Sequence, residues 1–360
     1  MTDDPFIYAL MNTRYEQVLI NRTATIKQAL ERINSLHGLP LTLFVTEGKG
    51  ALCGTLTDGD IRRGLLSGAS LEEQVTRVMH RDFRFLKQDM ECASVFREAR
   101  AAGIAVLPVL DDEGHISEIV DLRTTRALLP LDAVLMAGGR GERLRPLTEK
   151  VPKPLLPVGG KPIIDHNVEA LQHCGIENIH VTVNYLHEQI EKHFADRAAT
   201  ADRVPVKCVA EPAPLGTFGS IGLVSGLTHA NVLVMNSDLL TTIDFEKMFE
   251  QHISSGASLT MAVTTYTVSV PYAIVKTRED RVESFQEKPT YTYFANAGIY
   301  IVRRDKLAAI SGEERVDATD FIDFLLAKGD KVTYFPIDGT WIDIGSPDDY
   351  ALACSKAANQ

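Results

Sequence analysis

Short hydrophobic runs alternate with amphipathic stretches in the part of the chain that begins near Leu131. Runs at 132–138, 179–185 and 231–238 are separated by stretches of helical spacing such as 163–175. This alternation is typical of βαβ units, which form a mostly parallel sheet. The later runs carry more strand and predict an antiparallel part: 258–266, 272–277, 281–288 and 297–302. We therefore expect an α/β domain with a Rossmann-like, mixed and mostly parallel sheet.

The first third of the chain contains a weak internal repeat. An amphipathic helical stretch and two apolar strands occupy 26–57, and a helix begins at Asp58. The same order of helix, strand and strand returns over 91–121. Repeats of this kind indicate that one structural unit is used twice. We expect a two-module α+β domain over 1–127, followed by the α/β domain over 128–360.

Composition narrows the possible partners and the compartment. The chain has 360 residues and a formal net charge of −11. Proteins bind nucleic acid by neutralising phosphates with Lys and Arg, so the acidic balance argues against a nucleic-acid partner. The five cysteines are scattered without metal-ligand spacing or a disulfide framework, which favours a reducing cytoplasm. The sequence shows no secretory signal and no apolar stretch of membrane-spanning length, so no membrane partner is expected.

The most informative motif is MAGGRGERLRPLTEKVPKPLLPV, which continues the apolar run at 132–138. It lacks the last glycine of the dinucleotide fingerprint and the Ser or Thr of the phosphate loop. The physics is similar, because Gly138, Gly139 and Gly141 let backbone N–H groups approach an anion without an obstructing Cβ. The loop follows a strand end, where α/β sheets bind ligands, so we expect a phosphorylated ligand here.

Two cationic residues and one carboxylate are further candidates for binding a phosphorylated ligand. Arg143 and Lys153 could neutralise a triphosphate, and a proline on each side of Lys153 stiffens its backbone. Asp238 ends the apolar run at 231–238, where a carboxylate is poorly solvated unless it is paired. A metal ion is a natural partner there, and the alternative is that Asp238 caps the following helix.

The stretch from Gly138 to Val158 reads G-G-x-G-E-R-L-x-P-x-T-x-x-x-P-K-P-L-L-P-V and closely resembles the signature of sugar-1-phosphate nucleotidyltransferases. The resemblance extends from Leu131 to about Tyr350. In that family a nucleoside triphosphate and a sugar-1-phosphate give a nucleotide-sugar and pyrophosphate. Catalysis is mainly positioning and charge neutralisation, as in phosphoryl transfer generally.

The resemblance assigns roles to individual residues. The backbone from Ala137 to Gly141 would cradle the nucleotide, Arg143 would neutralise the β- and γ-phosphates, and Lys153 would approach the α-phosphate. The late motif GTWIDIGSPDDY resembles the family's second metal motif. It implies that Asp343 and Asp238 together bind Mg²⁺, the expected cofactor.

Further family positions concern the sugar phosphate. The segment VESFQEKP supplies Glu287 for sugar hydroxyls and Lys288, a third catalytic cation, for the sugar phosphate. An exposed hairpin ion pair is the alternative for this pair. Asn296 stands where the family contacts sugar hydroxyls. Ala273 replaces the family's usual glycine after tyrosine, so its added methyl group would narrow the sugar pocket.

The segment EPAPLGTFGS occupies the position that reads the base in this family. Glu211 would face the hydrogen-bonding edge of the base, and Gly216 and Thr217 would contribute to nucleotide binding. A carboxylate only accepts hydrogen bonds, so it suits a base that presents donors. Guanine presents two such groups and uracil or thymine one. The L-G-T-x-G pattern resembles guanylyltransferases, which makes GTP the first choice and leaves UTP and dTTP open.

The repeat in the first third, with its segment GTLTDGDIRR, resembles a pair of CBS modules over about 15–126. The resemblance implies that Thr57 and Asp60 hold the ribose of a regulatory nucleotide. In the second module Asp121 and Thr124 take these places, so the ribose carboxylate is missing there. The alternative is that the acidic residues of the first module only cap a helix.

A CBS pair fused ahead of a transferase resembles glucosamine-1-phosphate guanylyltransferases of bacterial legionaminic acid pathways. Glucosamine-1-phosphate is therefore the first candidate acceptor, followed by mannose- or heptose-1-phosphate. CBS pairs commonly associate with a second pair, so the resemblance also implies a homo-oligomer. A non-catalytic nucleotide sensor is the alternative from another class of protein.

Overall fold

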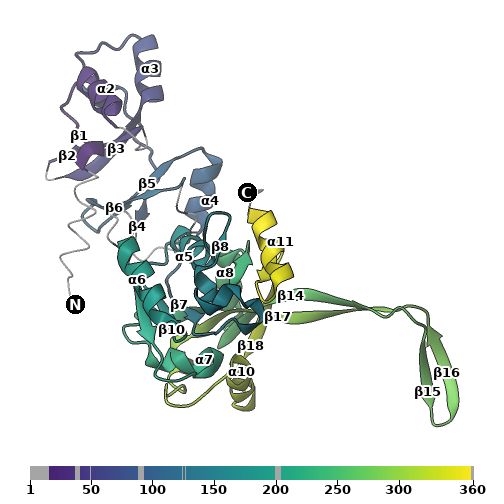
Figure 1. Ribbon diagram of the computed structural model, residues 1–360. Helices are drawn as coiled ribbons and strands as arrows, with labels where there is room; N and C mark the ends of the chain where they lie inside the picture. Colours follow the sequence, from purple (N-terminus) through teal and green to yellow (C-terminus); the bar gives the residue numbers. More distant parts are fainter. Residues whose placement is uncertain are drawn as a thin grey trace. The chain divides into compact units, whose positions relative to one another are not determined.

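The structure is a computed structural model that describes residues 16–36, 41–48, 50–87, 93–123, 125, 127–198 and 204–357. The chain divides into two compact units, Met1–Leu128 and Leu129–Gln360, which are called the amino-terminal and carboxyl-terminal units (Figure 1).

The amino-terminal unit contains two modules of the same topology. In each module the first two strands are parallel and the last two antiparallel, with a helix between the first and second strand. The sheets have the orders β1-β2-β3 and β4-β5-β6, so the repeat predicted from the sequence is present. The elements are β1 (Leu19–Asn21), α2 (Ile26–Asn34), β2 (Thr42–Glu47), β3 (Ala51–Thr57), α3 (Asp58–Leu66), β4 (Leu86–Lys87), α4 (Ala93–Ala101), β5 (Val106–Leu110) and β6 (Ile116–Asp121).

Each module buries apolar side chains of its own, and Val106 and Ile119 of the second module also belong to the core of the first. Helix α2 begins with a capping box between Thr25 and Gln28, and it buries one apolar face against β2. Phe44 is a fully buried member of this first core. In the second module Phe96 and Leu107 occupy the corresponding interior. Burial of such side chains is the main driving force for folding of small modules.

The carboxyl-terminal unit is built on a seven-stranded sheet of order β11-β10-β7-β12-β17-β14-β18. Strand β17 is antiparallel to both neighbours, and the other adjacent pairs are parallel. This is the mixed, mostly parallel sheet that the alternating pattern predicts. The strands are β7 (Leu131–Ala137), β10 (Ile179–Val183), β11 (Val206–Ala210), β12 (Asn231–Asn236), β14 (Leu259–Ser269), β17 (Thr290–Arg303) and β18 (Val332–Pro336).

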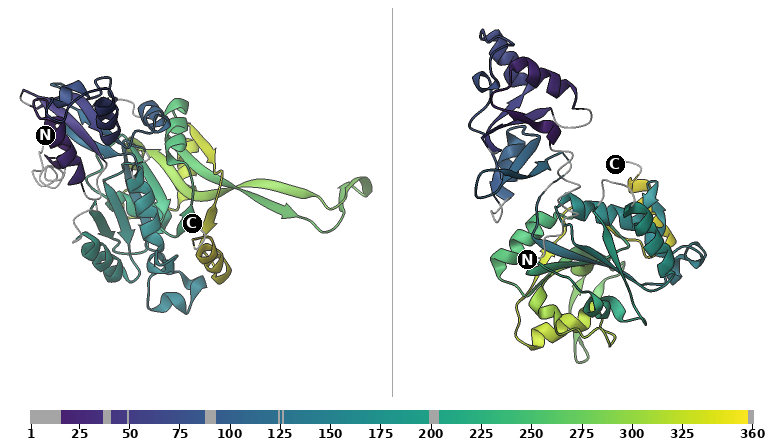
Figure 2. Two further views of the ribbon diagram at one scale, coloured as in Figure 1. Left: turned by 90° about the horizontal axis from the view of Figure 1, so that it is seen from above. Right: turned by 90° about the vertical axis from the view of Figure 1, so that its left-hand side faces the viewer.

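Helices cover both faces of this sheet (Figure 2). Val134 and Val234 belong to a core with Phe321 on one face, while Leu135 and Met235, which alternate with them, are buried on the other. In the described part of the chain, no helix combines the length and apolar character that crossing a membrane requires. The helices are α5 (Ile163–His173), α6 (His187–Ala198), α7 (Gly216–Gly219), α8 (Phe245–Ser255), α9 (Arg304–Leu307), α10 (Ala318–Ala327) and α11 (Pro347–Ala357).

Two small strand pairs complete the body of this unit. Strand β13 (Leu239–Thr241) pairs antiparallel with β19 (Trp341–Asp343), and β8 (Pro157–Val158) pairs with β9 (Lys161–Pro162). The first pair joins segments that lie far apart in the sequence, and β13 follows closely after the carboxyl end of β12.

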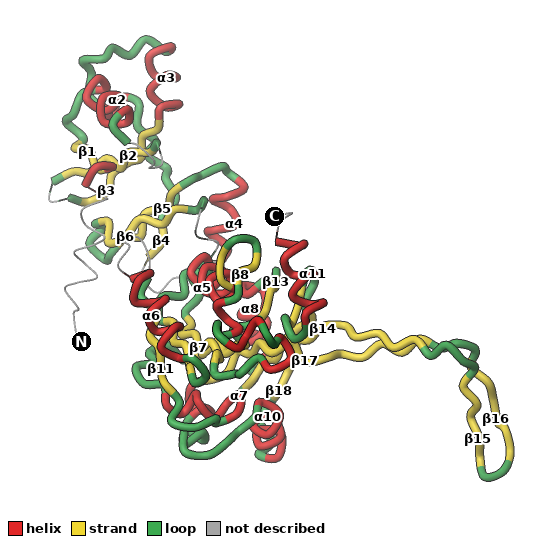
Figure 3. The backbone as a smooth tube through the Cα atoms, in the orientation of Figure 1, coloured by secondary structure: helices red, strands yellow, loops and turns green. Residues whose placement is uncertain are grey.

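A long two-stranded arm leaves the body of the carboxyl-terminal unit (Figures 1 and 3). The pairing of β14 with β18 ends at Val263, beyond which β14 pairs only with β17. Strands β15 (Ile274–Arg278) and β16 (Arg281–Gln286) form a separate hairpin at the end of this ribbon. Residues 264–295 are called the arm.

Candidate active site

Three loops at the carboxyl ends of parallel strands line one cavity. The loops after β7, β11 and β12 begin at Gly138, Glu211 and Ser237. Because these strands run in one direction, their carboxyl ends meet at one edge of the sheet. The cavity there has a volume of about 340 Å³. The predicted site residues in its lining are Ala137, Gly138, Gly139, Lys153, Glu211, Gly216, Thr217 and Asp238.

The glycine loop packs tightly at two of its three predicted glycines. A Cβ at Gly138 would lie 2.5 Å from Glu211 Oε1, closer than real Cβ contacts allow. Gly141 has a left-handed backbone with φ of 60°, and Thr148 Oγ1 donates a hydrogen bond of 2.8 Å to its carbonyl oxygen. A Cβ at Gly139 would meet nothing within 4 Å. The backbone and packing therefore favour glycine at 141, a Cβ at 138 would displace the Glu211 carboxylate, and the space beside Gly139 is open.

Lys153 is charged and yet 8% exposed. It begins a short 3-10 helix, Lys153–Leu155, directly after Pro152. Its ammonium nitrogen contacts Asp238 Oδ2 and lies 3.8 Å from Asp343 Oδ1. A buried cation is costly unless it is paired, so the two carboxylates explain why this lysine can be buried.

The pairing of β13 with β19 brings Asp238 and Asp343 together. Leu239 is the partner of Asp343 in this ladder, and Ile344 N donates a hydrogen bond of 3.2 Å to Asp238 O. Asp238 Oδ1 is buried and has no hydrogen-bond partner among the described residues. Burial, and then the charge of Asp238, raise the pKa of Asp343, and nearby cations oppose this rise. Two close carboxylates, one with an unpaired buried oxygen, fit a divalent cation such as Mg²⁺.

Arg143 lies beside the same carboxylates but is exposed, outside the cavity lining. A Cβ at Gly345 would lie 2.9 Å from Arg143 Nη2, and the charge of Arg143 lowers the pKa of Asp343. Within the described ranges, no group of three or more His, Cys, Asp or Glu residues forms a complete metal site. A cation at the two aspartates would therefore share its coordination with phosphate oxygens and water.

The opposite wall of the cavity comes from the start of α7. Gly216 has a left-handed backbone with φ of 77°, and a Cβ there would lie 2.7 Å from Asp317 Oδ1. The same Oδ1 accepts a hydrogen bond of 3.2 Å from Thr217 N. Burial raises the pKa of Glu211, although its Oε2 accepts a hydrogen bond from Leu215 N. This wall thus combines a half-buried carboxylate with exposed backbone groups.

Sequence reasoning missed three polar residues of this cavity. They are Asn236, Arg315 and Asp317. Arg315 Nη2 lies 3.0 Å from Asp317 Oδ2, and Asp317 caps α10 together with Asp320. The capping pattern was visible in the sequence, but it indicates only that a helix begins. The proximity of Asp317 to Gly216 depends on the tertiary fold.

This geometry agrees with comparisons against known proteins. The family model described as Nucleotidyl transferase matches residues 132–360, and the CBS domain model matches residues 3–67. The chain belongs to the nucleotidyl transferase family. The amino-terminal unit is accordingly called the CBS unit, and the predicted relationship to a CBS module is confirmed for its first module, whose topology the second module shares.

Two curated relatives of this nucleotidyl transferase are guanylyltransferases by name. The D-glycero-α-D-manno-heptose 1-phosphate guanylyltransferase of Aneurinibacillus thermoaerophilus is 35% identical over 62% of this chain and 96% of the relative. The mannose-1-phosphate guanylyltransferase of Mycobacterium tuberculosis is 34% identical over 61% of this chain, which spans 62% of that relative's length. The chain is therefore an enzyme of the sugar-1-phosphate nucleotidyltransferase type.

A solved structure supports the fold. A Bacillus anthracis protein described as a glucose-1-phosphate thymidylyltransferase, in complex with a sucrose, superposes with a TM-score of 0.51. It is 23% identical and covers 64% of this chain and 96% of its own. At this identity the likeness shows the shared fold alone.

Three predicted sugar-side residues lie outside the cavity of their own chain. Ala273, Glu287 and Lys288 are exposed residues of the arm, and Lys288 has a left-handed backbone with φ of 40°. Asn296 lies just beyond the arm on β17, where its Nδ2 donates a hydrogen bond of 2.8 Å to Tyr300 Oη. A single chain does not bring the three arm residues into the cavity, and the roles of all four stay predictions.

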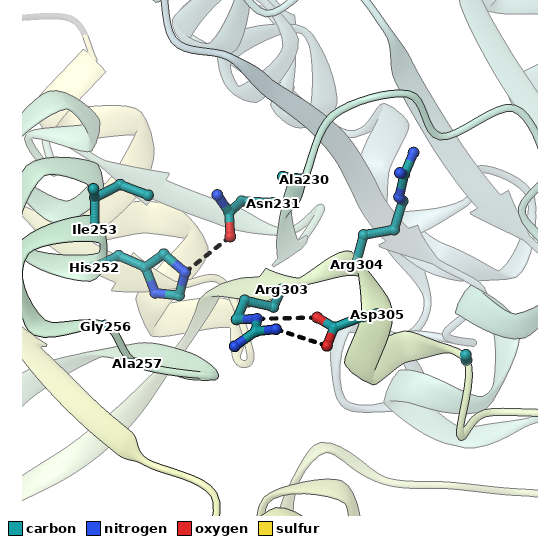
Figure 4. Close-up of a pocket in the computed structure, with 10 residues that line it drawn as sticks. Ala230, Asn231, His252, Ile253, Gly256, Ala257, Arg303, Arg304 and Asp305 are labelled. Atoms are coloured by element: carbon teal, nitrogen blue, oxygen red, sulfur yellow. Dashed lines mark hydrogen bonds and ion pairs between the residues drawn. The ribbon is translucent and has the colours of Figure 1, made fainter.

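A second cavity, of about 760 Å³, lies at the other end of the strands, where β12 begins and β17 ends (Figure 4). On its wall, His252 Nε2 lies 3.2 Å from Asn231 Oδ1 and Nδ1 lies 2.8 Å from Thr260 Oγ1. Burial, and then the charge of Arg303, lower the pKa of His252 to about 4. Arg303 is itself paired with Asp305. His252 is thus a neutral histidine that links helix α8 to strands β12 and β14 of the sheet.

The predicted regulatory residues form a helix cap in the CBS unit. Asp60 Oδ2 accepts hydrogen bonds from Thr57 N at 2.8 Å and Thr57 Oγ1 at 2.6 Å, and Oδ1 pairs with Arg63 at 2.6 Å. Desolvation raises the pKa of Asp60, but these bonds outweigh it and hold the pKa below its usual range. In the second module Asp121 pairs with Arg123, and Thr124 lies outside the described residues. A nucleotide at Thr57 and Asp60 stays a prediction.

Proposed function

We propose that this enzyme transfers GMP from GTP to a sugar-1-phosphate, with glucosamine-1-phosphate as the acceptor. The observation that carries the proposal is the position of Lys153 against Asp238 and Asp343, beside the glycine loop. In the reaction a phosphate oxygen of the acceptor bonds to the α-phosphorus of GTP. The bond from the α-phosphorus to the bridging oxygen breaks, and pyrophosphate leaves with the electron pair.

The residues of the cavity suit this reaction, because the reaction brings the negatively charged phosphates of two substrates together. Backbone N–H groups of the glycine loop would donate to the triphosphate, and Lys153, which lines the cavity, would meet the charge at the α-phosphate. Arg143, whose charge acts on Asp343, would neutralise the leaving pyrophosphate. Asp238 and Asp343 would hold Mg²⁺, which supplies further positive charge to the phosphates.

The choice of guanine rests on Glu211 and on the relatives. The carboxylate of Glu211 lines the cavity, and an ionised carboxylate accepts the N1–H and N2–H donors that guanine presents together. Two relatives that cover the catalytic unit are named guanylyltransferases. Uridylyl or thymidylyl transfer is the competing assignment, because uracil and thymine offer a single donor to the same carboxylate.

The choice of glucosamine-1-phosphate rests on the fusion of a CBS unit to the transferase. The names of the relatives favour mannose- or heptose-1-phosphate as the second candidates. We place the reaction in the cytoplasm, where nucleoside triphosphates are available and the scattered cysteines stay reduced. The CBS unit is proposed to bind a regulatory nucleotide through Thr57, with Asp60 shared between the cap and the ribose.

Pyrophosphate release with each of GTP, ATP, UTP and dTTP against a panel of sugar-1-phosphates tests the proposal. The panel contains glucosamine-, mannose-, heptose- and glucose-1-phosphate, and GTP with glucosamine-1-phosphate should give the highest kcat/KM. A preference for another sugar-1-phosphate or another nucleoside triphosphate would replace the proposed acceptor or the proposed base. If nucleotides bind but no substrate pair releases pyrophosphate, the protein would instead be a non-catalytic nucleotide sensor. A Lys153→Met preparation controls for contaminating enzymes.

A further inference from the structure

The arm is a two-stranded ribbon that contacts the body at its base, where the rings of Phe294 and Tyr334 of β18 have their centres 5.2 Å apart. Its paired positions run from Thr264 opposite Ala295 to Ser269 opposite Thr290, and the β15–β16 hairpin continues beyond them. The fifteen residues from Thr264 to Arg278 reach at most about 50 Å. Figures 1 and 2 show the arm projecting from the body, with no helix or strand of the body beside the β15–β16 hairpin. A two-stranded ribbon of this kind is marginally stable in water unless another surface packs against it.

Exposed apolar side chains are concentrated on the arm. Eight of the eighteen large hydrophobic side chains that are exposed among the described residues lie there, on less than a tenth of the chain. The most exposed are Tyr272 at 75% and Phe285 at 70%. The others are Tyr266, Val268, Val275, Val282, Tyr293 and Phe294. Large exposed apolar patches mark interaction sites.

The area and the charge of the arm suit a second copy of the chain. Five of the six aromatic residues of the arm are each 57–75% exposed, and such side chains bury about 150–250 Å² apiece. Two arms exchanged by a twofold axis would bury on the order of 1,000 Å² or more, which meets the size of a specific interface. The arm has four cationic and four acidic side chains, so it carries no net charge that would select nucleic acid or an anionic membrane.

The arm also carries a cation that the cavity of a single chain lacks. Lys153 is already paired with two aspartates, and Arg315 is paired with Asp317. Lys288 has no ion pair among the described residues, is exposed, and is held in a left-handed backbone. Such a conformation costs free energy in a non-glycine residue and is concentrated at ligand-binding positions. A reaction that joins two phosphorylated anions requires an additional cation for the second phosphate.

We propose that two copies of the chain exchange arms, so that Lys288 and Glu287 of one copy enter the active-site cavity of the other. The exchange buries the aromatic side chains and supplies the cation for the acceptor's phosphate. Only the role of Lys288 in this proposal rests on the proposed function. The exchange of arms concerns how two chains assemble, and it does not depend on the reaction. The exposed Phe324 and Leu326 on α10, which begins beside the cavity, offer apolar surface to the incoming arm.

Complementation between two inactive full-length chains tests the shared site. Lys153→Met disables the cavity and keeps the arm, whereas Lys288→Met disables the arm and keeps the cavity. With exchanged arms, an equimolar mixture that has re-equilibrated should regain about one quarter of wild-type turnover, because half of the dimers are mixed and each has one intact site. If each arm serves its own chain, every site keeps one defect and no activity returns, which would overturn the proposal.

Cross-linking tests the exchange without requiring activity. Lys288→Cys in one chain and Arg315→Cys in another should yield a covalent dimer with a short bismaleimide when the two are mixed. Each variant alone serves as the control for native cysteines and should give no such product. A double variant that cross-links only within one chain, or a mixture without covalent dimer, would contradict exchange. A cross-linked dimer without pyrophosphate release from any substrate pair would reject the proposed function alone.

Discussion

Lys153 contacts Asp238 across a separation of 85 residues, and the same ammonium group faces Asp343 at 3.8 Å. The contact joins the end of the glycine loop to the end of β12 and to β19. A buried lysine between two carboxylates balances their charge, and it defines where a phosphate and a divalent cation would bind. The charge arrangement at this point is therefore the centre of the proposed mechanism.

Lys153→Met should lower kcat by about 10²–10³-fold, the range found when one preorganised group that stabilises the transition state is removed. The substitution keeps the aliphatic stem and removes the charge. Pyrophosphate release measures the effect, and the melting temperature shows whether the fold survives. Lys161→Met is the matched control, because Lys161 pairs with Glu169 away from the cavity. Turnover near wild type in Lys153→Met would remove this lysine from the transition state.

Gly138→Ala should raise the KM for the nucleotide about tenfold or more, because its new methyl group would push Glu211 from its position. Steady-state kinetics and direct nucleotide binding measure this change. Gly139→Ala is the informative comparison, since its Cβ meets nothing within 4 Å of the protein. Weaker nucleotide binding in Gly139→Ala would indicate that the bound nucleotide contacts residue 139. Weaker binding in Gly138→Ala alone would indicate that Glu211 has been displaced. Unchanged binding in Gly138→Ala would contradict the packing described for the loop.

Acid should destabilise the carboxyl-terminal unit through His252. Its pKa in the folded protein is about 4, below the ordinary value of about 6.5, so the unfolded chain binds the proton more readily. The contribution is fully present above about pH 6.5 and is lost as the pH falls towards 4, with a total on the order of 3 kcal/mol.

Urea unfolding at several pH values, followed by the fluorescence of Trp341, measures this dependence. Trp341 is the only tryptophan of the chain and belongs to the carboxyl-terminal unit. His252→Gln does not titrate and should flatten the stability curve over this range. An equally steep curve in the variant would assign the acid sensitivity to other groups.

Asp60→Ala should lower the stability of the CBS unit by about 1 kcal/mol, because it removes the N3 carboxylate that completes the capping box of Thr57 at the start of α3. Asp58→Ala changes the same helical turn but breaks only an exposed ion pair with Arg62, so its effect should stay below about 0.5 kcal/mol. Thermal unfolding with and without AMP, ATP and GTP measures both roles. Nucleotide stabilisation that is present in the wild type and lost only in Asp60→Ala would show that the carboxylate also binds ribose.

The glycine loop illustrates what can be predicted from local sequence. The left-handed backbone at Gly141 and the burial pattern of β7 arise from backbone sterics and from strand periodicity, which neighbouring residues encode. The same is true of the repeated helix and strands of the CBS unit. The residues predicted from the glycine loop could therefore be named before the structure placed Gly138, Gly139 and Lys153 in one cavity lining.

The arm and the wall at α10 illustrate what could not be predicted. The sequence indicates that 272–277 and 281–288 are strands, and the structure contains the β15–β16 hairpin there. Where a hairpin lies depends on which surface packs against it, and no local pattern records that contact. For the same reason Arg315 and Asp317 were missed, because only the close approach of Gly216 brings them to the cavity.

The sequence by itself thus determined the two-unit architecture, the nucleotide loop, and the identities of Lys153, Asp238 and Asp343, because each depends on local periodicity or on a continuous motif. The tertiary structure decided that the two aspartates meet through β13 and β19, and that Lys288 is an exposed residue of the arm, outside the lining of its own cavity. Contacts between distant segments arise from the packing of whole surfaces, and packing of that kind is a property of the folded chain and of its copies.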